Sequence, residues 1–184
     1  NKAIKNHQQA LTIARRPGSK DKSASTLLYI GAVYHAWGQY DKAIENLQQG
    51  LTLLRKQGIE NLTIARFLNN ISKVYYAWGQ YDKAIENYQQ VLTISRRLGK
   101  EDGVAAGLHN IGGVYRAWGQ YDKAIKNFQQ ALTIARRLGA EDSIATFLSN
   151  IGSIYYEWGQ YDKAIENFQQ ALTIHRRLGK EDGV

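Results

Sequence analysis

Three asparagines recur at intervals of 40 residues and are the polar side chains best suited to bind a ligand: Asn70, Asn110 and Asn150. Asparagine is unfavourable in the interior of a helix, so its repetition needs a reason. An amide both donates and accepts hydrogen bonds, and a row of amides could hold the backbone of an extended peptide. The alternative is that each asparagine hydrogen-bonds to the neighbouring copy of the repeated sequence. Tyr29 stands at the corresponding earlier position, so the row covers only the later part of the chain.

Beside these asparagines lie positions, spaced by three, four and three residues, that share one helix face and vary from copy to copy. We call this set the variable stripe, and it consists of Ser25, Leu28, Ala32, His35, Arg66, Asn69, Lys73, Tyr76, Ala106, His109, Gly113, Arg116, Thr146, Ser149, Ser153 and Tyr156. An inert solvent face would carry mainly Lys, Glu and Gln. Tyr and Arg are instead typical of binding hot spots, and small residues let a ligand approach. We therefore expect partner binding through Asn70, Asn110, Asn150, Arg66, Asn69, Lys73, Tyr76, His109, Arg116, Ser149 and Tyr156.

The titratable side chains show no catalytic or metal-binding pattern. The histidines occupy different points of the repeated sequence and lack the spacing of metal ligands: His7, His35, His109 and His175. We find no catalytic carboxylate pair, no nucleophile beside a base and no phosphate-binding loop. The chain has no cysteine, which excludes disulfides and cysteine-based zinc sites. We expect no catalysis, no cofactor and no metal.

Cationic residues concentrate in pairs that follow apolar runs. The chain has 24 Lys and Arg against 16 Asp and Glu, a net charge of +8. Cations at a helix C-terminus complement its dipole by about 0.3–1 kcal/mol each, which is a structural reason for the pairs. Stacked along the fold, the pairs would also form a basic ridge that favours acidic partners. Nucleic acid is a less favoured partner, since the aromatic residues that would stack on bases are needed between helices. The ridge comprises Arg55, Lys56, Arg96, Arg97, Arg136, Arg137, Arg176 and Arg177, preceded by Arg15 and Arg16.

All of these residues belong to a sequence that repeats four times. The motif Trp-Gly-Gln-Tyr-Asp-Lys-Ala-Ile recurs at spacings of 41, 40 and 40 residues, starting at Trp37, Trp78, Trp118 and Trp158. A fixed period of this length is typical of solenoids built from helix pairs. In the last copy, apolar residues every three or four positions predict a first helix up to Trp158. Gly159 indicates a turn, and a second helix then continues to a glycine cap at Gly179.

Small residues recur at one point of each predicted helix. Glycine stands on the first helix at 31, 112 and 152, and alanine stands on the second at 43, 84, 124 and 164. A missing side chain lets two helices approach closely, and a nearby aromatic ring can fill the volume. The second copy has Ser72 in place of glycine, for which we expect only a local adjustment.

The last copy resembles the tetratricopeptide repeat in both the types and the spacing of its residues. The residues that carry the resemblance are Asn150-Ile151-Gly152, Tyr155, Gly159-Gln160-Tyr161, Ala164, Phe168 and Ala171-Leu172. The usual period of that family is about 34 residues, and the period of 40 is similar to that of kinesin light chains and bacterial signalling proteins. The resemblance implies an all-α, right-handed superhelical solenoid of about nine antiparallel helices. It also implies that the first helices line a concave face that binds partners, and that asparagines at this position hold peptide main chain.

We expect a single solenoid over residues 1–184. Its parts are the second helix of a truncated repeat at 1–18, full repeats at 19–58, 59–99, 100–139 and 140–179, and the start of another at 180–184. The chain would then be an excerpt of a longer array.

The predicted function is a cytoplasmic protein–protein interaction scaffold that binds a protein or peptide. We expect no association with a membrane, because no apolar run reaches about 20 residues and no signal peptide is recognisable. The alternative function is a structural segment that self-associates through its terminal helices, where Ile165 and Phe168 would expose apolar surface.

Overall fold

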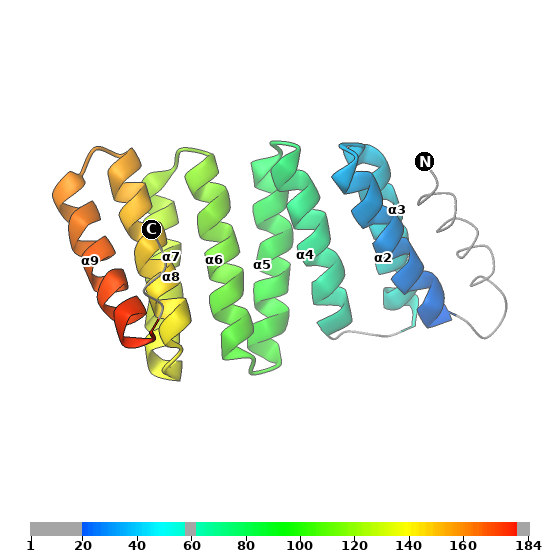
Figure 1. Ribbon diagram of the computed structural model, residues 1–184. Helices are drawn as coiled ribbons and strands as arrows, with labels where there is room; N and C mark the ends of the chain where they lie inside the picture. Colours follow the sequence, from blue (N-terminus) through cyan, green and yellow to red (C-terminus); the bar gives the residue numbers. More distant parts are fainter. Residues whose placement is uncertain (1–19, 58–61, 180–184) are drawn as a thin grey trace. The chain divides into compact units, whose positions relative to one another are not determined.

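The computed structural model describes residues 20–57 and 62–179, and all regular structure within these ranges is helical (Figure 1). The first helices of the repeats are α2 (Lys20–Ala36), α4 (Leu62–Ala77), α6 (Glu101–Ala117) and α8 (Glu141–Glu157). The second helices are α3 (Tyr40–Lys56), α5 (Tyr81–Arg97), α7 (Tyr121–Leu138) and α9 (Tyr161–Arg177). The all-α class and the helix-pair repeat predicted from the sequence are confirmed. The ninth helix expected within 1–18, and the repeat start at 180–184, lie outside the described residues.

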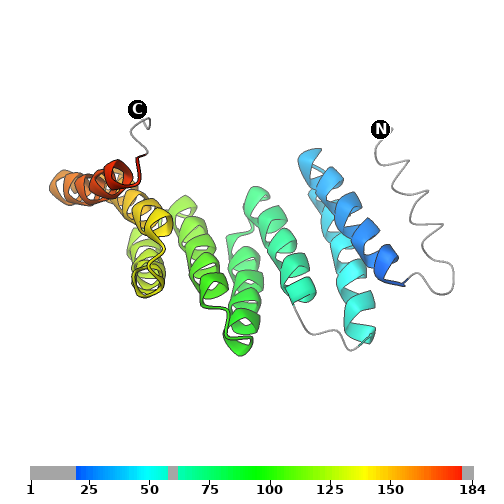
Figure 2. The ribbon, with the colours of Figure 1, turned by 60° about the horizontal axis from the view of Figure 1, so that its bottom comes forward.

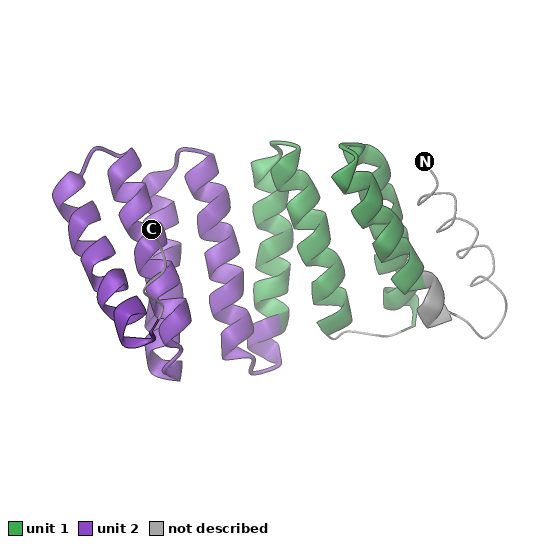
Figure 3. Ribbon diagram, viewed as in Figure 1, with its two compact units in different colours: residues 1–94 green, residues 95–184 purple. Residues whose placement is uncertain are grey.

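The chain divides into two compact units, residues 1–94 and 95–184 (Figure 3). In the first unit, α2 packs against α3, and both contact α4. In the second unit, each helix from α6 to α9 packs against the next one. The helices of a pair lie side by side in both views (Figures 1 and 2), and α2, α6 and α8 each pack against the second helix of their own repeat.

The turn between the two helices of a repeat is built around a glycine. In the last repeat, Gly159 adopts φ 75°, a left-handed conformation that costs residues with a Cβ atom about 1–2 kcal/mol. Backbone hydrogen bonds close the turn, with the Gln160 N–H donating to the Tyr155 carbonyl at 2.8 Å. The second helix then begins at Tyr161 with no side-chain cap. Asp162 lies in the first turn, where its charge complements the helix dipole.

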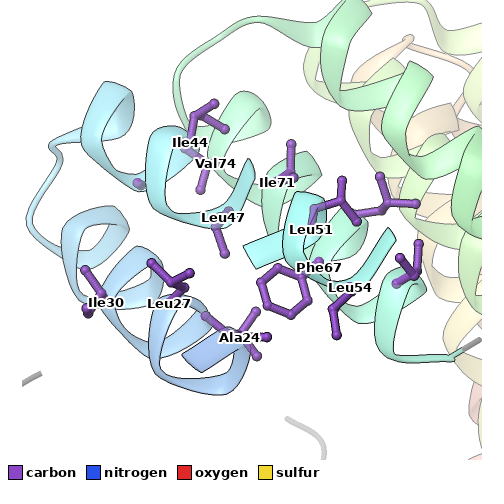
Figure 4. Packing of buried hydrophobic residues seen from close by; sticks show 14 of the residues in the cluster. Ala24, Leu27, Ile30, Ile44, Leu47, Leu51, Leu54, Phe67, Ile71 and Val74 are labelled. Atoms are coloured by element: carbon purple, nitrogen blue, oxygen red, sulfur yellow. The ribbon is translucent and has the colours of Figure 1, made fainter. Parts of the chain in front are cut away.

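The core of the first unit forms where α2, α3 and α4 meet (Figure 4). The Phe67 ring from α4 is fully buried between the other two helices and lies against Gly50 of α3. A Cβ atom at residue 50 would come within 2.3 Å of that ring, so the glycine makes room for it. Close approach is also confirmed within the first and last helix pairs, because a Cβ atom at Gly31 would lie 3.3 Å from the Ala43 carbonyl oxygen and one at Gly152 would lie 3.2 Å from the Ala164 carbonyl oxygen.

Candidate binding surface on the first helices

In the first unit, the variable stripe lies mainly on the exposed side of α2 and α4. Arg66, Lys73 and Tyr76 are exposed on α4, and Asn69 is half-buried among them. On α2, His35 is half-buried, and burial together with the nearby positive charge of Lys73 lowers its pKa. Leu28 is the exception, because it is buried in the core of this unit. The expectation that all stripe positions face away from the core is therefore wrong at Leu28, whose apolar side chain packs inward.

In the second unit, the variable stripe contains both exposed and half-buried residues. The exposed members are Ala106, Thr146 and Tyr156, and the half-buried members are His109, Gly113, Arg116, Ser149 and Ser153. Arg116 reaches from α6 to α8 and forms an ion pair with Glu157 through its Nε and Nη2 atoms. The sequence pattern singled out Arg116 but not Glu157. Their spacing of 41 residues, one repeat apart, is the signal that could have identified the pair.

The three repeated asparagines do not share one hydrogen-bond pattern. Asn70 donates from Nδ2 to the Arg66 carbonyl of its own helix at 2.8 Å. Asn150 places Nδ2 at 3.1 Å from Nε2 of His109, in the neighbouring repeat. Asn110 hydrogen-bonds to His109 through its side chain. The alternative in which asparagine joins adjacent repeats is thus observed at Asn150.

His109 lies among two aromatic rings and two asparagine side chains of the second unit. Its ring lies 5.3 Å from the Phe128 ring and 5.4 Å from the Phe147 ring, measured between centroids. Burial lowers the pKa of the imidazole, and the hydrogen bond with Asn110 opposes this shift. An imidazole nitrogen that accepts the N–H of Asn150 is unprotonated, so the geometry and the direction of the pKa shift agree.

Next to this cluster, the surface between α6 and α8 is hollowed. The hollow has a volume of about 340 Å³, and residues from the end of α7 also line it. Its walls are mostly apolar, and the charged side chains among its lining residues are both carboxylates. It is lined by Asp102, Ala105, Ala106, His109, Ala135, Leu138, Ala140, Asp142, Ser143, Thr146 and Phe147. The hollow could not be predicted from the sequence, because the depth of a surface depends on which side chains of two repeats come together.

The predicted basic ridge is partly neutralised by carboxylates in the two helix pairs of the second unit, α6 with α7 and α8 with α9. Arg137 pairs with Glu101 at 2.9 Å, and Arg177 pairs with Glu141 at 2.7 Å. In the first unit, Arg55 Nη2 lies 3.5 Å from Gln90 Oε1. These contacts join the end of a second helix to a neighbouring helix, so they give the cationic pairs a structural role beside the dipole.

Trp78 and Trp158 take part in contacts between repeats but remain accessible. The ring of Tyr40 lies 5.9 Å from that of Trp78, and the ring of Tyr121 lies 6.0 Å from that of Trp158. Each contact joins the start of a second helix to the end of the next first helix. Trp78 and Trp158 nevertheless stay about 40% exposed, because they lie beside the turns rather than in the core.

Residues 20–57 and 62–179 contain no group of three His, Cys, Asp or Glu side chains that could hold a metal ion. Among the helices described, none has the length and apolar character required to span a bilayer.

Solved structures with a similar fold come from several sources. BtubC from P. vanneervenii has 23% identity and a TM-score of 0.83, covering 100% of this chain and 76% of that chain. A putative kinesin light chain from P. anserina with nearly identical TPR-like repeats has 23% identity and a TM-score of 0.82, covering 98% and 88%. A Rap protein complexed with competence and sporulation factor has 20% identity and a TM-score of 0.74, covering 94% of this chain and 48% of that protein. At these identities the likeness concerns the fold.

A comparison with curated protein sequences gives no significant match. The sequence does match the tetratricopeptide repeat family over residues 1–56, 63–137 and 103–177, which together make up most of the chain. The repeat, its helix pairs and its structural neighbours agree with this match. The chain belongs to the tetratricopeptide repeat family.

Proposed function

We propose that this protein is a non-catalytic, cytoplasmic interaction scaffold that binds an extended peptide or a partner surface on the face formed by its first helices. The observation that carries the proposal is the composition of that face. Several of its side chains are exposed and lie outside the core, namely Arg66, Lys73 and Tyr76 on α4 and Tyr156 on α8. Exposed tyrosines and arginines on a rigid helix are the side chains that supply most binding energy at interfaces.

A structural neighbour supports the same use of the fold. The Rap protein structure is a complex with competence and sporulation factor. The asparagines contribute less than the sequence indicates, since the Nδ2 atoms of Asn70 and Asn150 already have partners within the protein. Their amide oxygens and second N–H groups are the atoms that a peptide backbone would use.

The test starts from a random peptide library selected against the immobilised chain, followed by affinity measurements on the selected peptides. The variant Tyr76→Ala/Tyr156→Ala should weaken binding by at least about tenfold, because truncation of a hot spot costs about 2 kcal/mol or more. The matched control Gln89→Ala/Gln129→Ala changes exposed positions on α5 and α7 and should leave affinity unchanged. Peptides that lose affinity for the control but not for the tyrosine variant would refute the proposal.

Self-association is the second candidate function, and one feature of α9 favours it. Ile165 and Phe168 are 54% and 39% exposed, whereas Ile125 and Phe128, at the same positions of α7, are 7% and 2% exposed. The difference arises because α8 packs against α7. The exposed face of α9 thus matches a first helix of this same sequence, which a second copy can supply.

Sedimentation of the protein over a range of concentrations tests this candidate. Ile165→Glu/Leu172→Glu should abolish any concentration-dependent increase in mass. Glu166→Gln/Gln169→Glu changes other exposed positions of α9 at the same net charge and should preserve it. A native chain that stays monomeric at the highest concentration would exclude self-association through α9.

A further inference from the structure

We propose that His109 is a positioning residue, which orients the side-chain amide of Asn150 so that its Oδ1 atom accepts an N–H group from the backbone of a bound peptide. The inference rests on the proposed peptide binding by the first helices and names one atom that the peptide uses. Protonation of His109 turns the same amide over, which makes binding at this position depend on pH.

The amide of Asn150 has a defined orientation because the imidazole of the neighbouring repeat holds one end of it. Its Nδ2 atom lies 3.1 Å from Nε2 of His109. Since the oxygen and nitrogen of an amide lie on opposite sides of the group, Oδ1 points away from the imidazole. Asn150 is half-buried, and within residues 20–57 and 62–179 every fully buried nitrogen or oxygen of such a side chain has a hydrogen-bond partner. The Oδ1 atom has no partner among these residues, so it is open to solvent and can accept a further hydrogen bond.

The imidazole is itself held by side chains from three helices. The rings of Phe128 from α7 and Phe147 from α8 both contact it. On α6, the hydrogen bond with Asn110 raises the pKa of the imidazole, which is the effect of an amide oxygen that accepts an imidazole N–H. The proton of the neutral ring therefore lies on the nitrogen that faces Asn110, and Nε2 is left to accept the N–H of Asn150.

The first two repeats provide an internal comparison. Leu28 stands at the position of His109, one repeat before Asn70, and its hydrocarbon side chain cannot accept a hydrogen bond. There the asparagine bonds to its own helix, since Asn70 Nδ2 donates to the Arg66 carbonyl at 2.8 Å. The orientation of the repeated asparagine thus follows the residue that the preceding repeat carries at the position of His109.

Protonation of His109 changes which amide atom faces the peptide. An imidazolium donates from both of its nitrogens, so Nε2 can no longer accept the N–H of Asn150. A half-turn of the amide restores the hydrogen bond, with Oδ1 now accepting from the imidazolium. The Nδ2 atom then points to the peptide, and a donor at this place cannot bind a peptide N–H.

The surroundings of His109 place this change at acid pH. The charged residues that line the hollow with it are Asp102 of α6 and Asp142 of α8, both of which are exposed. Burial of the ring outweighs the effect of Asn110 and lowers the pKa of His109 below its ordinary value, so the ring is neutral at pH 7. The residues that α7 contributes to the ring contacts and to the hollow carry no charge: Phe128, Ala135 and Leu138.

NMR of the full chain without a ligand, isotopically labelled in nitrogen, tests the orientation of the amide. At neutral pH, a scalar coupling across the hydrogen bond should join Asn150 Nδ2 to His109 Nε2, and it should disappear as the imidazole is protonated. In His109→Leu, which carries the residue that the first repeat buries at this position, the Asn150 amide should behave like that of Asn70. A native chain with no coupling and with a protonated Nε2 at neutral pH would overturn the proposal.

A peptide selected from the library then reports which atom it uses. Each of its peptide bonds is replaced in turn by an ester, which removes one N–H group. One replacement should weaken binding to the native chain by about 2- to 12-fold, as expected for a hydrogen bond between neutral groups. The same replacement should cost nothing in Asn150→Ala or in His109→Leu. Asn70→Ala, the matched control, removes the corresponding amide of the second repeat and should retain the cost.

The variant His109→Gln separates positioning from packing. The amide oxygen of glutamine can accept the N–H of Asn150 but does not titrate. This variant should retain the cost of the ester replacement, and acidification should weaken its binding less than that of the native chain. His35 titrates in both proteins, so the difference between them belongs to His109. Equal dependence of affinity on pH in the two proteins would overturn the proposal.

The outcome is separable from that of the proposed function. Library-selected peptides that lose affinity for Tyr156→Ala, but have no ester position coupled to Asn150, refute this inference and leave the scaffold proposal intact. A coupling between Asn150 and His109 in the free protein, with no peptide selected on the first helices, supports the orientation of the amide and refutes the scaffold proposal.

Discussion

Replacing Gly112 with alanine should reveal how tightly α6 and α7 approach each other. A Cβ atom at residue 112 would meet three atoms of the Phe128 ring at 3.0–3.1 Å. That ring is 2% exposed and also contacts His109, so it has little freedom to move away. Forcing an extra methyl group into such a core costs about 1–3 kcal/mol.

The neighbouring Gly113 provides a control in the same helix. A Cβ atom there would meet nothing within 4 Å. Gly113→Ala should therefore show only the intrinsic gain of alanine over glycine in a helix, about 0.5–1 kcal/mol of stabilisation. Gly112→Ala has the same gain but also the steric cost, so it should range from neutral to about 2.5 kcal/mol destabilising. The two variants should differ by about 1–3 kcal/mol.

Thermal unfolding followed by circular dichroism measures the difference. For a chain of this size, 1 kcal/mol corresponds to about 2–4 °C in melting temperature. The melting temperature of Gly113→Ala should lie above that of the native protein, and that of Gly112→Ala should lie at or below it. If both variants were stabilised equally, the Phe128 ring would be free to move and the close-approach account would be wrong.

Three further outcomes are expected. Acidification below pH 6.5 should destabilise the fold through His109, because burial lowers the pKa of this imidazole in the folded state below its unfolded value and the unfolded chain therefore binds the proton first. Urea unfolding at several pH values measures the free energy of unfolding, whose dependence on pH should be smaller in His109→Asn than in the native protein. His35 titrates in both proteins, so an equal dependence would contradict the prediction. Gly139→Ala should destabilise by about 1–2 kcal/mol, because φ is 64° at this helix cap, and a gain in melting temperature would contradict the strain argument. In a double-mutant cycle, Arg116→Gln and Glu157→Gln should couple by about 0.2–1 kcal/mol, since both side chains are about one-third exposed; zero coupling would mean that the ion pair contributes nothing.

Much of the fold could be predicted because it depends on local, repeated signals. Within one helix pair, the structure follows from the spacing of apolar residues and from the glycine at the turn. These signals recur four times with a period of about 40 residues. The glycines at the turns adopt the left-handed conformation expected of them, as at Gly159. The alternation of small and large residues likewise predicted close helix approach, which the Gly112–Phe128 contact confirms.

The candidate site could be predicted only in part. Comparison of the repeats separated variable from constant positions. A variable position is not necessarily exposed, however, since Leu28 occupies a variable position and is buried. Comparison of the repeats did not identify the hydrogen-bond partners one repeat apart, Asn150 with His109 and Arg116 with Glu157. Those pairs depend on side-chain directions across two helices.

The sequence by itself determined the family, the helix pairs and the face that is free to vary, because these follow from periodicity along a single chain. Only the tertiary structure decided which varying residues meet. It brings Asp102, His109 and Asp142 together in the lining of one apolar hollow. It also gives Asn150, which we expected to bind a ligand, a hydrogen bond with His109 of the neighbouring repeat. The physical reason is that depth, charge and hydrogen bonding at a surface are set by neighbouring side chains from different repeats, and packing determines those neighbours.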